Sequence, residues 1–189
     1  MIASGRLIAT VSFFVVALAV LQTRQVVRTF RSLNPEGLRM GTLAPPRDFK
    51  LADGTPLPAD ELAGRPVVVT FWAAWCAPCR MEMPELAEAV EGWNSHAEPK
   101  DRAVLVAVNQ GDDPASVTMF TNDPRFKSVR FAFDKTGEAA EAWKVQGLPT
   151  LIVIDRNGSI AMTQVGYQPN SQYRVAGALS AARGPEKKP

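Results

Sequence analysis

The chain has 189 residues, of which 46% are apolar, with 15 prolines, 13 glycines, two cysteines and one histidine. This length predicts one domain, and an apolar fraction of this size without a glycine period excludes a disordered or collagen-like chain. Two cysteines cannot build a disulfide scaffold, and with one histidine they fall short of a four-ligand zinc site.

The formal net charge of +2 is unevenly distributed along the chain. Four of the 21 basic residues lie in residues 1–31, which contain no acid, so 17 basic residues face 19 acids in the rest of the chain. A domain with this charge balance has no broad basic face to follow phosphates. Nucleic-acid binding is therefore not expected.

Residues 7–23 carry no charge, and they follow Arg6 and the α-amino group as an export signal would. At about 1.5 Å per residue a helix here would span about 25 Å, against a bilayer core of about 30 Å. We interpret it first as an upright membrane anchor with Arg6 and Arg24 reaching the interfaces. A signal cleaved after Ala17-Leu18-Ala19 and a buried core helix are the alternatives. Three arginines between residues 24 and 31 weaken the charge asymmetry expected of an exported protein.

Residues 32–46 are rich in proline and glycine, which predicts a tether between this leader and the domain. A short hairpin is expected next, with Asp53-Gly54 as the turn between FKLA and TPLP. The last residues, 184–189, are expected to be a disordered tail.

The run VVVTFW at residues 67–72 is continuous, β-branched and aromatic, which predicts a central buried strand. After WCAPCR, apolar residues recur every three or four positions through Trp93, which predicts a helix. Strands alternating with helices, then a hairpin and a last helix, predict an α/β fold with a mixed central sheet flanked by helices. The other expected elements are strands at 103–109, 130–134, 150–155 and 160–165 and helices at 114–121, 136–143 and 170–182.

The motif Cys76-Ala77-Pro78-Cys79 lies where the buried strand is expected to give way to the helix. At a helix N-terminus, free N–H groups and the macrodipole favour a negative sulfur, so Cys76 is expected to be a nucleophile near neutral pH. Cys79 lies one turn on, where it can form a disulfide with Cys76 and release whatever Cys76 had attacked. Pro78 is tolerated because first-turn N–H groups have no helical partner.

A structural disulfide and half of a metal site are the other interpretations of this pair. Cross-linking so short a loop contributes only about 2 kcal/mol. For a metal, the chain offers no second cysteine pair, and His96 stands alone in a polar stretch where a surface position is expected. Arg80, and not histidine, follows the second cysteine, so the motif is not a haem-attachment site.

The segment FWAAWCAPCRMEMPEL resembles the thioredoxin superfamily, and more narrowly its membrane-anchored TlpA, ResA and CcmG/DsbE group of thiol–disulfide oxidoreductases. The resemblance extends upstream to APPRDFKLADGTPLPADELAGRPVVV and downstream to WKVQGLPTLIVIDRNGSI and VGY, in family order, over about residues 43–182. It implies a thioredoxin-like domain at 47–183 with an N-terminal β-hairpin extension, preceded by a signal anchor or signal peptide at 1–31. It implies no cofactor beyond a redox-active disulfide, and no metal.

The resemblance also implies roles for individual residues. Cys76 would be the attacking thiol and Cys79 the resolving one. The Leu148–Pro149 peptide bond would be cis and face the disulfide, where a substrate strand can pair with neighbouring backbone groups. The alternative is a trans proline that only begins the next strand. The residues expected to bind substrate are Trp75, Ala77, Pro78, Leu148 and Pro149.

Glu82 is the expected proton partner of Cys79. Ordinary thioredoxin carries a buried aspartate just before its Phe-Trp pair, where this chain has Thr70. In the TlpA/ResA group a glutamate follows the second cysteine by three residues, and Glu82 matches it. Helical spacing puts Glu82 on the side of Cys79, where partial burial should raise the pKa of the carboxyl. An ordinary solvated helix acid is the alternative.

The sequence also predicts where four further residues near the motif lie. Trp75 is expected over the active-site surface and Trp72 mostly in the core. Pro84 should kink the helix or lie near its first turns. Arg80 either adds positive potential near Cys76 or is solvated.

Together these patterns predict a membrane-tethered, extracytoplasmic thiol–disulfide oxidoreductase that reduces client disulfides from the periplasmic side, or a secreted one if the signal is cleaved. The resemblance implies apocytochrome c or copper-site proteins as clients and a membrane thiol donor of the CcdA or DsbD kind. The alternatives are a copper-handling chaperone and a redox-silent binding module on the same fold. Related copper carriers add a downstream histidine, and no histidine follows His96 here.

Overall fold

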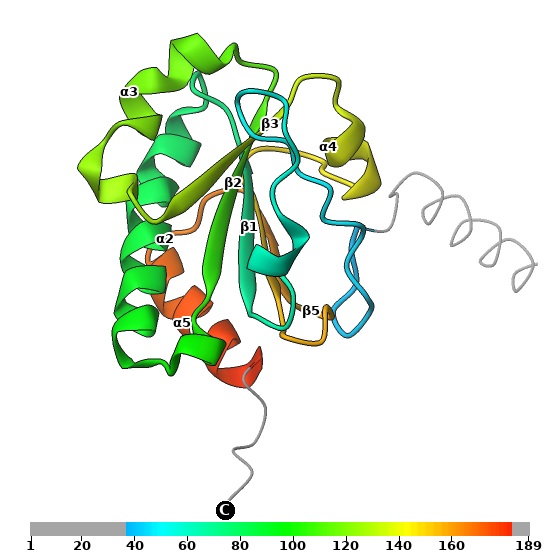
Figure 1. The fold of residues 1–189 in the computed structure, drawn as a ribbon, viewed down its shortest axis with the longest axis vertical. Helices are drawn as coiled ribbons and strands as arrows, with labels where there is room; N and C mark the ends of the chain where they lie inside the picture. Colours follow the sequence, from blue (N-terminus) through cyan, green and yellow to red (C-terminus); the bar gives the residue numbers. More distant parts are fainter. Residues whose placement is uncertain (1–36, 183–189) are drawn as a thin grey trace, which may run out of the picture. The chain divides into compact units, whose positions relative to one another are not determined.

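The computed structural model describes residues 37–182 (Figure 1). The predicted signal or anchor at 1–31 and the predicted tail at 184–189 lie outside the described residues. The helices are α2 (Ala77–His96), α3 (Thr118–Thr121), α4 (Glu138–Ala142) and α5 (Ser171–Ala182), with 3-10 turns η1 (Ala59–Glu61), η2 (Pro99–Asp101), η3 (Pro114–Val117) and η4 (Pro124–Phe126). The strands are β1 (Val67–Trp72), β2 (Val104–Gln110), β3 (Val129–Asp134), β4 (Thr150–Ile154) and β5 (Ile160–Val165).

The five strands form one mixed sheet in the order β3-β2-β1-β4-β5. The pairs β1–β2 and β2–β3 are parallel, whereas β1–β4 and β4–β5 are antiparallel. The mixed α/β architecture predicted from the sequence is therefore confirmed. Because β1 and β2 run parallel, both end at the same edge of the sheet, where Trp72 is paired with Asn109.

Strand β1 contributes to two cores, one on each face of the sheet. All six of its residues are buried, and alternate side chains point to opposite faces. Val68 and Trp72 belong to the cluster that also contains the inner side of α2, whereas Val67, Val69 and Phe71 belong to the cluster on the other face. Burial on both faces explains why the sequence of this strand is continuously apolar except at Thr70.

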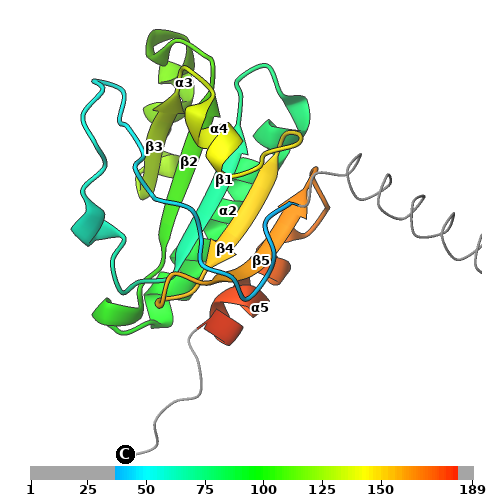
Figure 2. The same cartoon turned by 90° about the vertical axis from the view of Figure 1, so that its right-hand side faces the viewer.

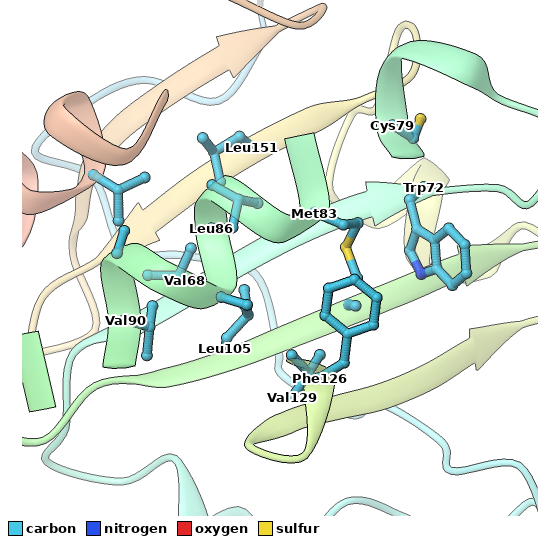
Figure 3. Packing of buried hydrophobic residues seen from close by; sticks show 14 of the residues in the cluster. Val68, Trp72, Cys79, Met83, Leu86, Val90, Leu105, Phe126, Val129 and Leu151 are labelled. Carbon is cyan, nitrogen blue, oxygen red and sulfur yellow. The ribbon is translucent and has the colours of Figure 1, made fainter. Parts of the chain in front are cut away.

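Helix α2 packs its inner stripe against the first of these faces. Met83, Leu86 and Val90 lie over the sheet. Cys79, in the first turn of the helix, lies near Trp72 at the end of β1 (Figure 3). Helix α5 packs beside α2 on the same side of the sheet. Pro84 lies inside α2, and the helix continues through it to His96.

The segment before β1 crosses the opposite face of the sheet (Figure 2). Gly41 N–H donates to Ile160 O over 2.8 Å, and Ala44 N–H donates to Gly158 O over 2.9 Å. This part of the segment predicted as a tether is thus hydrogen-bonded to the β4–β5 turn. The predicted hairpin around Asp53 is a tight turn with one isolated bridge, Lys50 to Pro56, and contains no regular strand.

Two predicted helices are shorter than expected. The first turn of the helix expected at 114–121 is the 3-10 turn η3, and Asp113 caps it by accepting from Ala115 N–H over 2.8 Å. The helix expected at 136–143 is the shorter α4, which begins at Glu138 because Gly137, at φ 81°, forms its N-cap. The Asp134 carboxylate, at the end of β3, accepts from the first N–H groups of α4.

Candidate active site

The two cysteines occupy the junction between β1 and α2. Cys76 is the N-cap of α2, and its Sγ accepts a hydrogen bond from Cys79 N–H over 3.2 Å. The two residues form a disulfide with a Cα–Cα distance of 5.3 Å, and only 4% of Cys76 and 1% of Cys79 is exposed. Pro78 lies in the first helical turn, where a missing N–H costs no hydrogen bond. The sequence thus places the first sulfur at the positive end of the helix macrodipole.

The loop that leads into Cys76 is held at the peptide groups of Ala74. Ala74 N–H donates to the Asp112 carboxylate over 2.6 Å, and its carbonyl accepts from the Arg80 guanidinium over 2.6 Å. Asn109, at the end of β2, donates to the same oxygen of Asp112 over 2.8 Å. Asp112 was not among the predicted site residues, although its position just after β2 puts it at the sheet edge where Cys76 lies. Arg80 thus hydrogen-bonds to the loop.

Glu82 is buried between the sheet and α5, with 1% of its surface exposed. Thr70 Oγ1 donates to Glu82 Oε2 over 3.4 Å, and Gln164 Nε2 donates to Glu82 Oε1 over 3.3 Å. Ser171 Oγ lies 3.5 Å from the same Oε1, and its shorter hydrogen bond, over 2.7 Å, is donated to Gln168 O. The burial expected from the sequence is confirmed, and it is more complete than expected.

Burial raises the pKa of Glu82 from 4.5 to about 7. Desolvation of the carboxylate is the largest cause, and the nearby charge of Glu85 acts in the same direction. The hydrogen bonds from Thr70 and Ser171 partly oppose this rise because they favour the charged form. A carboxyl with a pKa near neutrality can both hold and release a proton under physiological conditions.

Glu85 lies one turn after Glu82 on α2 and is half-buried. One of its oxygens accepts from Tyr167 O–H over 2.7 Å, and the other accepts from Ser171 N–H over 2.9 Å. The latter bond places a carboxylate at the N-terminus of α5, a favourable position for a negative charge. This contact could not be predicted from local sequence, because Glu85 and Ser171 are 86 residues apart.

The Leu148–Pro149 peptide bond is cis, as the family resemblance implied. Phe71 pairs with Thr150 across β1 and β4, so Pro149 lies beside the end of β1 from which the cysteine loop starts. Pro149 is buried, its carbonyl accepts from Gly166 N–H over 2.7 Å, and Leu148 is half-buried. The fold therefore brings the predicted proline segment to the same edge of the sheet as the cysteines.

The two tryptophans near the motif differ sharply in exposure. Trp72 is completely buried, with its ring against Phe120 and Phe131 at centroid distances of 5.2 and 5.9 Å. Trp75, one residue before Cys76, is 70% exposed. The predicted core position of Trp72 and surface position of Trp75 are both confirmed. A large exposed aromatic side chain beside a reactive group is a common feature of protein-binding surfaces.

No group of three or more His, Cys, Asp or Glu side chains within residues 37–182 could hold a metal ion. A pocket of about 600 Å³ lies against the other core cluster, lined by residues such as Phe49, Val108 and Trp143, and it contains neither cysteine. None of the helices in that same range is long and apolar enough to span a bilayer.

The chain is similar to proteins of known family. The chain matches the Redoxin family over residues 39–179. It is 32% identical to the thiol-disulfide oxidoreductase ResA of Geobacillus kaustophilus, over 67% of this chain and 70% of that protein. It is also 32% identical to ResA of Oceanobacillus iheyensis, over 65% of this chain and 62% of that protein. The matched segment therefore spans less than two thirds of the Oceanobacillus protein.

A solved structure and a third relative are also similar to this chain. The crystal structure of a putative thiol:disulfide interchange protein DsbE from Chlorobium tepidum superimposes with a TM-score of 0.62 at 28% identity. The match covers 78% of this chain and all of that chain. A thioredoxin-like protein from Bacillus subtilis, YneN, is 30% identical over 69% of this chain and 74% of its own length.

Proposed function

Because the chain belongs to the Redoxin family, among the relatives of the ResA-type thiol-disulfide oxidoreductases, we propose that its Cys76–Cys79 pair exchanges electrons with disulfides of client proteins. The observation that carries this proposal is the position of the pair. Cys76 caps α2 and receives the Cys79 N–H, so a thiolate at Cys76 would be stabilised by the helix N-terminus.

In the proposed reaction the reduced protein starts with Cys76 as a thiolate. Its sulfur attacks one sulfur of the client disulfide, which forms a Cys76–client disulfide and releases the other client sulfur as a thiolate. Cys79 then loses its proton, attacks Cys76 Sγ, and releases the second client sulfur. Two electrons pass to the client, and the Cys76–Cys79 disulfide seen here is the oxidised product.

We assign Glu82 the proton that leaves Cys79. The carboxyl lies one helical turn after Cys79, and burial gives it a pKa of about 7. At neutral pH a large fraction of the molecules therefore carries Glu82 as a carboxylate that can accept a proton. Thr70 supports this role by donating a hydrogen bond to the carboxylate.

The residues that meet the client are proposed to be Trp75, Ala77 and Pro78 from the cysteine loop and Leu148 and Pro149 from the cis-proline segment. Trp75 is 70% exposed, and β1–β4 pairing places both segments at one edge of the sheet. An extended client segment beside Pro149 could add to the backbone hydrogen bonding there.

We further propose that the protein works outside the cytoplasm, tethered by residues 1–31, as a reductase. The uncharged apolar run at 7–23 supports an exported or anchored location. Clients such as apocytochrome c or copper-site proteins, and a membrane thiol donor of the CcdA or DsbD kind, fit this assignment. A reduction potential as oxidising as about −120 mV would contradict the reductive direction.

A cysteine trap in membranes of the producing cells tests the proposed function. Cys79→Ser leaves Cys76 able to attack but removes the resolving sulfur, so disulfide-linked complexes with distinct partners should accumulate. The matched control is Cys76→Ser, which retains one cysteine at the site but removes the attacking one. Equal amounts of complex with both variants, or none with either, would contradict the proposal.

A further inference from the structure

Two acids of α2 converge on the first residue of α5. Ser171 is fully buried, its N–H donates to Glu85 Oε2 over 2.9 Å, and its Oγ lies 3.5 Å from Glu82 Oε1. Ser171 therefore contacts the buried carboxyl with its hydroxyl and the half-buried carboxylate with its backbone.

The carboxyl group of Glu85 is held at both of its oxygens. Its two oxygens accept from separate donors, Tyr167 O–H and Ser171 N–H, and it lies at the N-terminus of a 12-residue helix. Charge-assisted bonds of this kind are stronger than neutral ones. The charge is therefore fixed in place one turn from Glu82.

The surroundings of Glu82 contain little else that is charged. The donors that reach its carboxyl come from β1, β5 and α5, and all three side chains are neutral: Thr70, Gln164 and Ser171. The titratable groups that interact with it within the described residues are Glu85 on α2 and Tyr167 on the loop before α5, and Cys79, one turn earlier on α2, is disulfide-bonded.

We propose that Glu85 and Ser171 are positioning residues of the redox site, which adjust the pH at which the buried Glu82 exchanges its proton. This inference rests on the proposed role of Glu82 as proton acceptor for Cys79. The two residues act in opposite directions. The negative charge of Glu85 disfavours a second charge on Glu82. The Ser171 hydroxyl, which donates to Gln168 O over 2.7 Å, favours the carboxylate because it can turn to donate to Glu82 Oε1, 3.5 Å away. The contacts at the junction of α2 and α5 thus add to the effect of burial on the pH range of exchange.

Opposite shifts in the titration of Glu82 are therefore expected from two variants of the full chain. Glu85→Gln removes the charge but keeps one oxygen for Ser171 N–H, while its amide N–H can donate to Tyr167 Oη; it should lower the midpoint by roughly one pH unit. Ser171→Ala removes the hydroxyl but keeps the N–H that Glu85 accepts, and should raise the midpoint by roughly half a unit. Glu88→Gln is the matched control, because Glu88 is an exposed acid on the same helix.

The titration midpoint of Glu82 is measured from its side-chain carboxyl ¹³C signal between about pH 4 and pH 9. The pH profile of exchange with a dithiol is measured for the same variants. A Glu82 midpoint that stays unchanged in Glu85→Gln, or that moves in the same direction in both variants, would overturn the inference. Since the carboxyl signal does not depend on catalysis, loss of exchange activity in the unmodified protein would count against the proposed function and not against the coupling. A loss of stability without a midpoint shift would show that the two residues are only structural.

Discussion

The hydroxyl of Thr70 donates to Glu82 Oε2 over 3.4 Å, which links the strand that leads into the cysteine loop to the helix that carries both cysteines. Thr70 occupies the strand position at which ordinary thioredoxin, by resemblance, has its buried acid. In this chain the acid comes from the helix, and the strand supplies a hydrogen-bond donor to it. The buried carboxyl is thus kept, but it is carried by a different element.

Glu82→Gln should stabilise the protein at alkaline pH. The pKa of Glu82 is raised from 4.5 to about 7, so the folded chain binds this proton more tightly than the unfolded chain. The stabilisation from the protonated carboxyl is complete below pH 4.5 and is lost as the pH rises to about 7. The shift corresponds to roughly 3 kcal/mol.

Urea unfolding of Glu82→Gln and the unmodified protein at several pH values measures this difference. The variant should be more stable by up to roughly 3 kcal/mol at about pH 8 and nearly equal at about pH 4. Glu88→Gln, at an exposed position, should follow the unmodified protein throughout. Parallel stability curves for all three proteins would contradict the raised pKa of Glu82.

The same Glu82→Gln variant should slow resolution of the mixed disulfide. Without a proton acceptor one helical turn from Cys79, we expect a rate loss of about 100-fold, in the range typical of general acid–base catalysis. The inflection at about pH 7 should also disappear from the pH profile. Rapid-mixing measurements of client release from a preformed Cys76 mixed disulfide test this step. An unchanged profile would remove Glu82 from the mechanism.

Asp112→Ala should loosen the cysteine loop, because it removes the acceptor of Ala74 N–H. We expect a loss of about 1–3 kcal/mol in the free energy of unfolding and slower exchange with dithiols. Asp112→Asn keeps an oxygen acceptor and should lose less of both. Asp113→Ala, which removes only the cap of η3, is the matched control for the exchange rate. Equal rates for Asp112→Ala and Asp113→Ala would show that the loop needs no such support.

Trp75→Ala should separate client binding from stability. The side chain is 70% exposed, so the free energy of unfolding should change by no more than about 0.5 kcal/mol. Exchange with a protein disulfide should slow, whereas exchange with a small dithiol should not. The fully buried neighbour provides the contrast, since Trp72→Ala should cost about 3–5 kcal/mol of stability. Equal slowing with large and small substrates would argue against a client-binding role of Trp75.

The sheet and the cysteine junction could be predicted from local sequence. The buried strand at 67–72 has a continuous apolar pattern, and the following helix has a regular one, so their boundary fixes the place of Cys76. The boundaries of α4 were less predictable, because a cap from Asp134 on another element decides where that helix begins.

The buried side of the site was only partly predictable. The three-residue spacing along one helix predicts that Glu82 lies on the same side as Cys79, and the family resemblance implies its role as proton partner. The partners Gln164 and Ser171 are 82 and 89 residues away, and their contacts exist only because β5 and α5 pack against α2. No sequence periodicity reports such a contact, and polar residues in those positions resemble ordinary surface residues.

Ionisation of Cys76 is the central property on which the whole account depends. In the Cys79→Ser variant, the rate of iodoacetamide alkylation against pH reports how much of Cys76 is present as thiolate. The account predicts a half-maximal rate below about pH 7.5, against about 8.5 for an ordinary cysteine, because the thiolate lies at the N-terminus of α2. A half-maximal rate at or above about pH 8.5, with no exchange between the unmodified protein and dithiols, would contradict it.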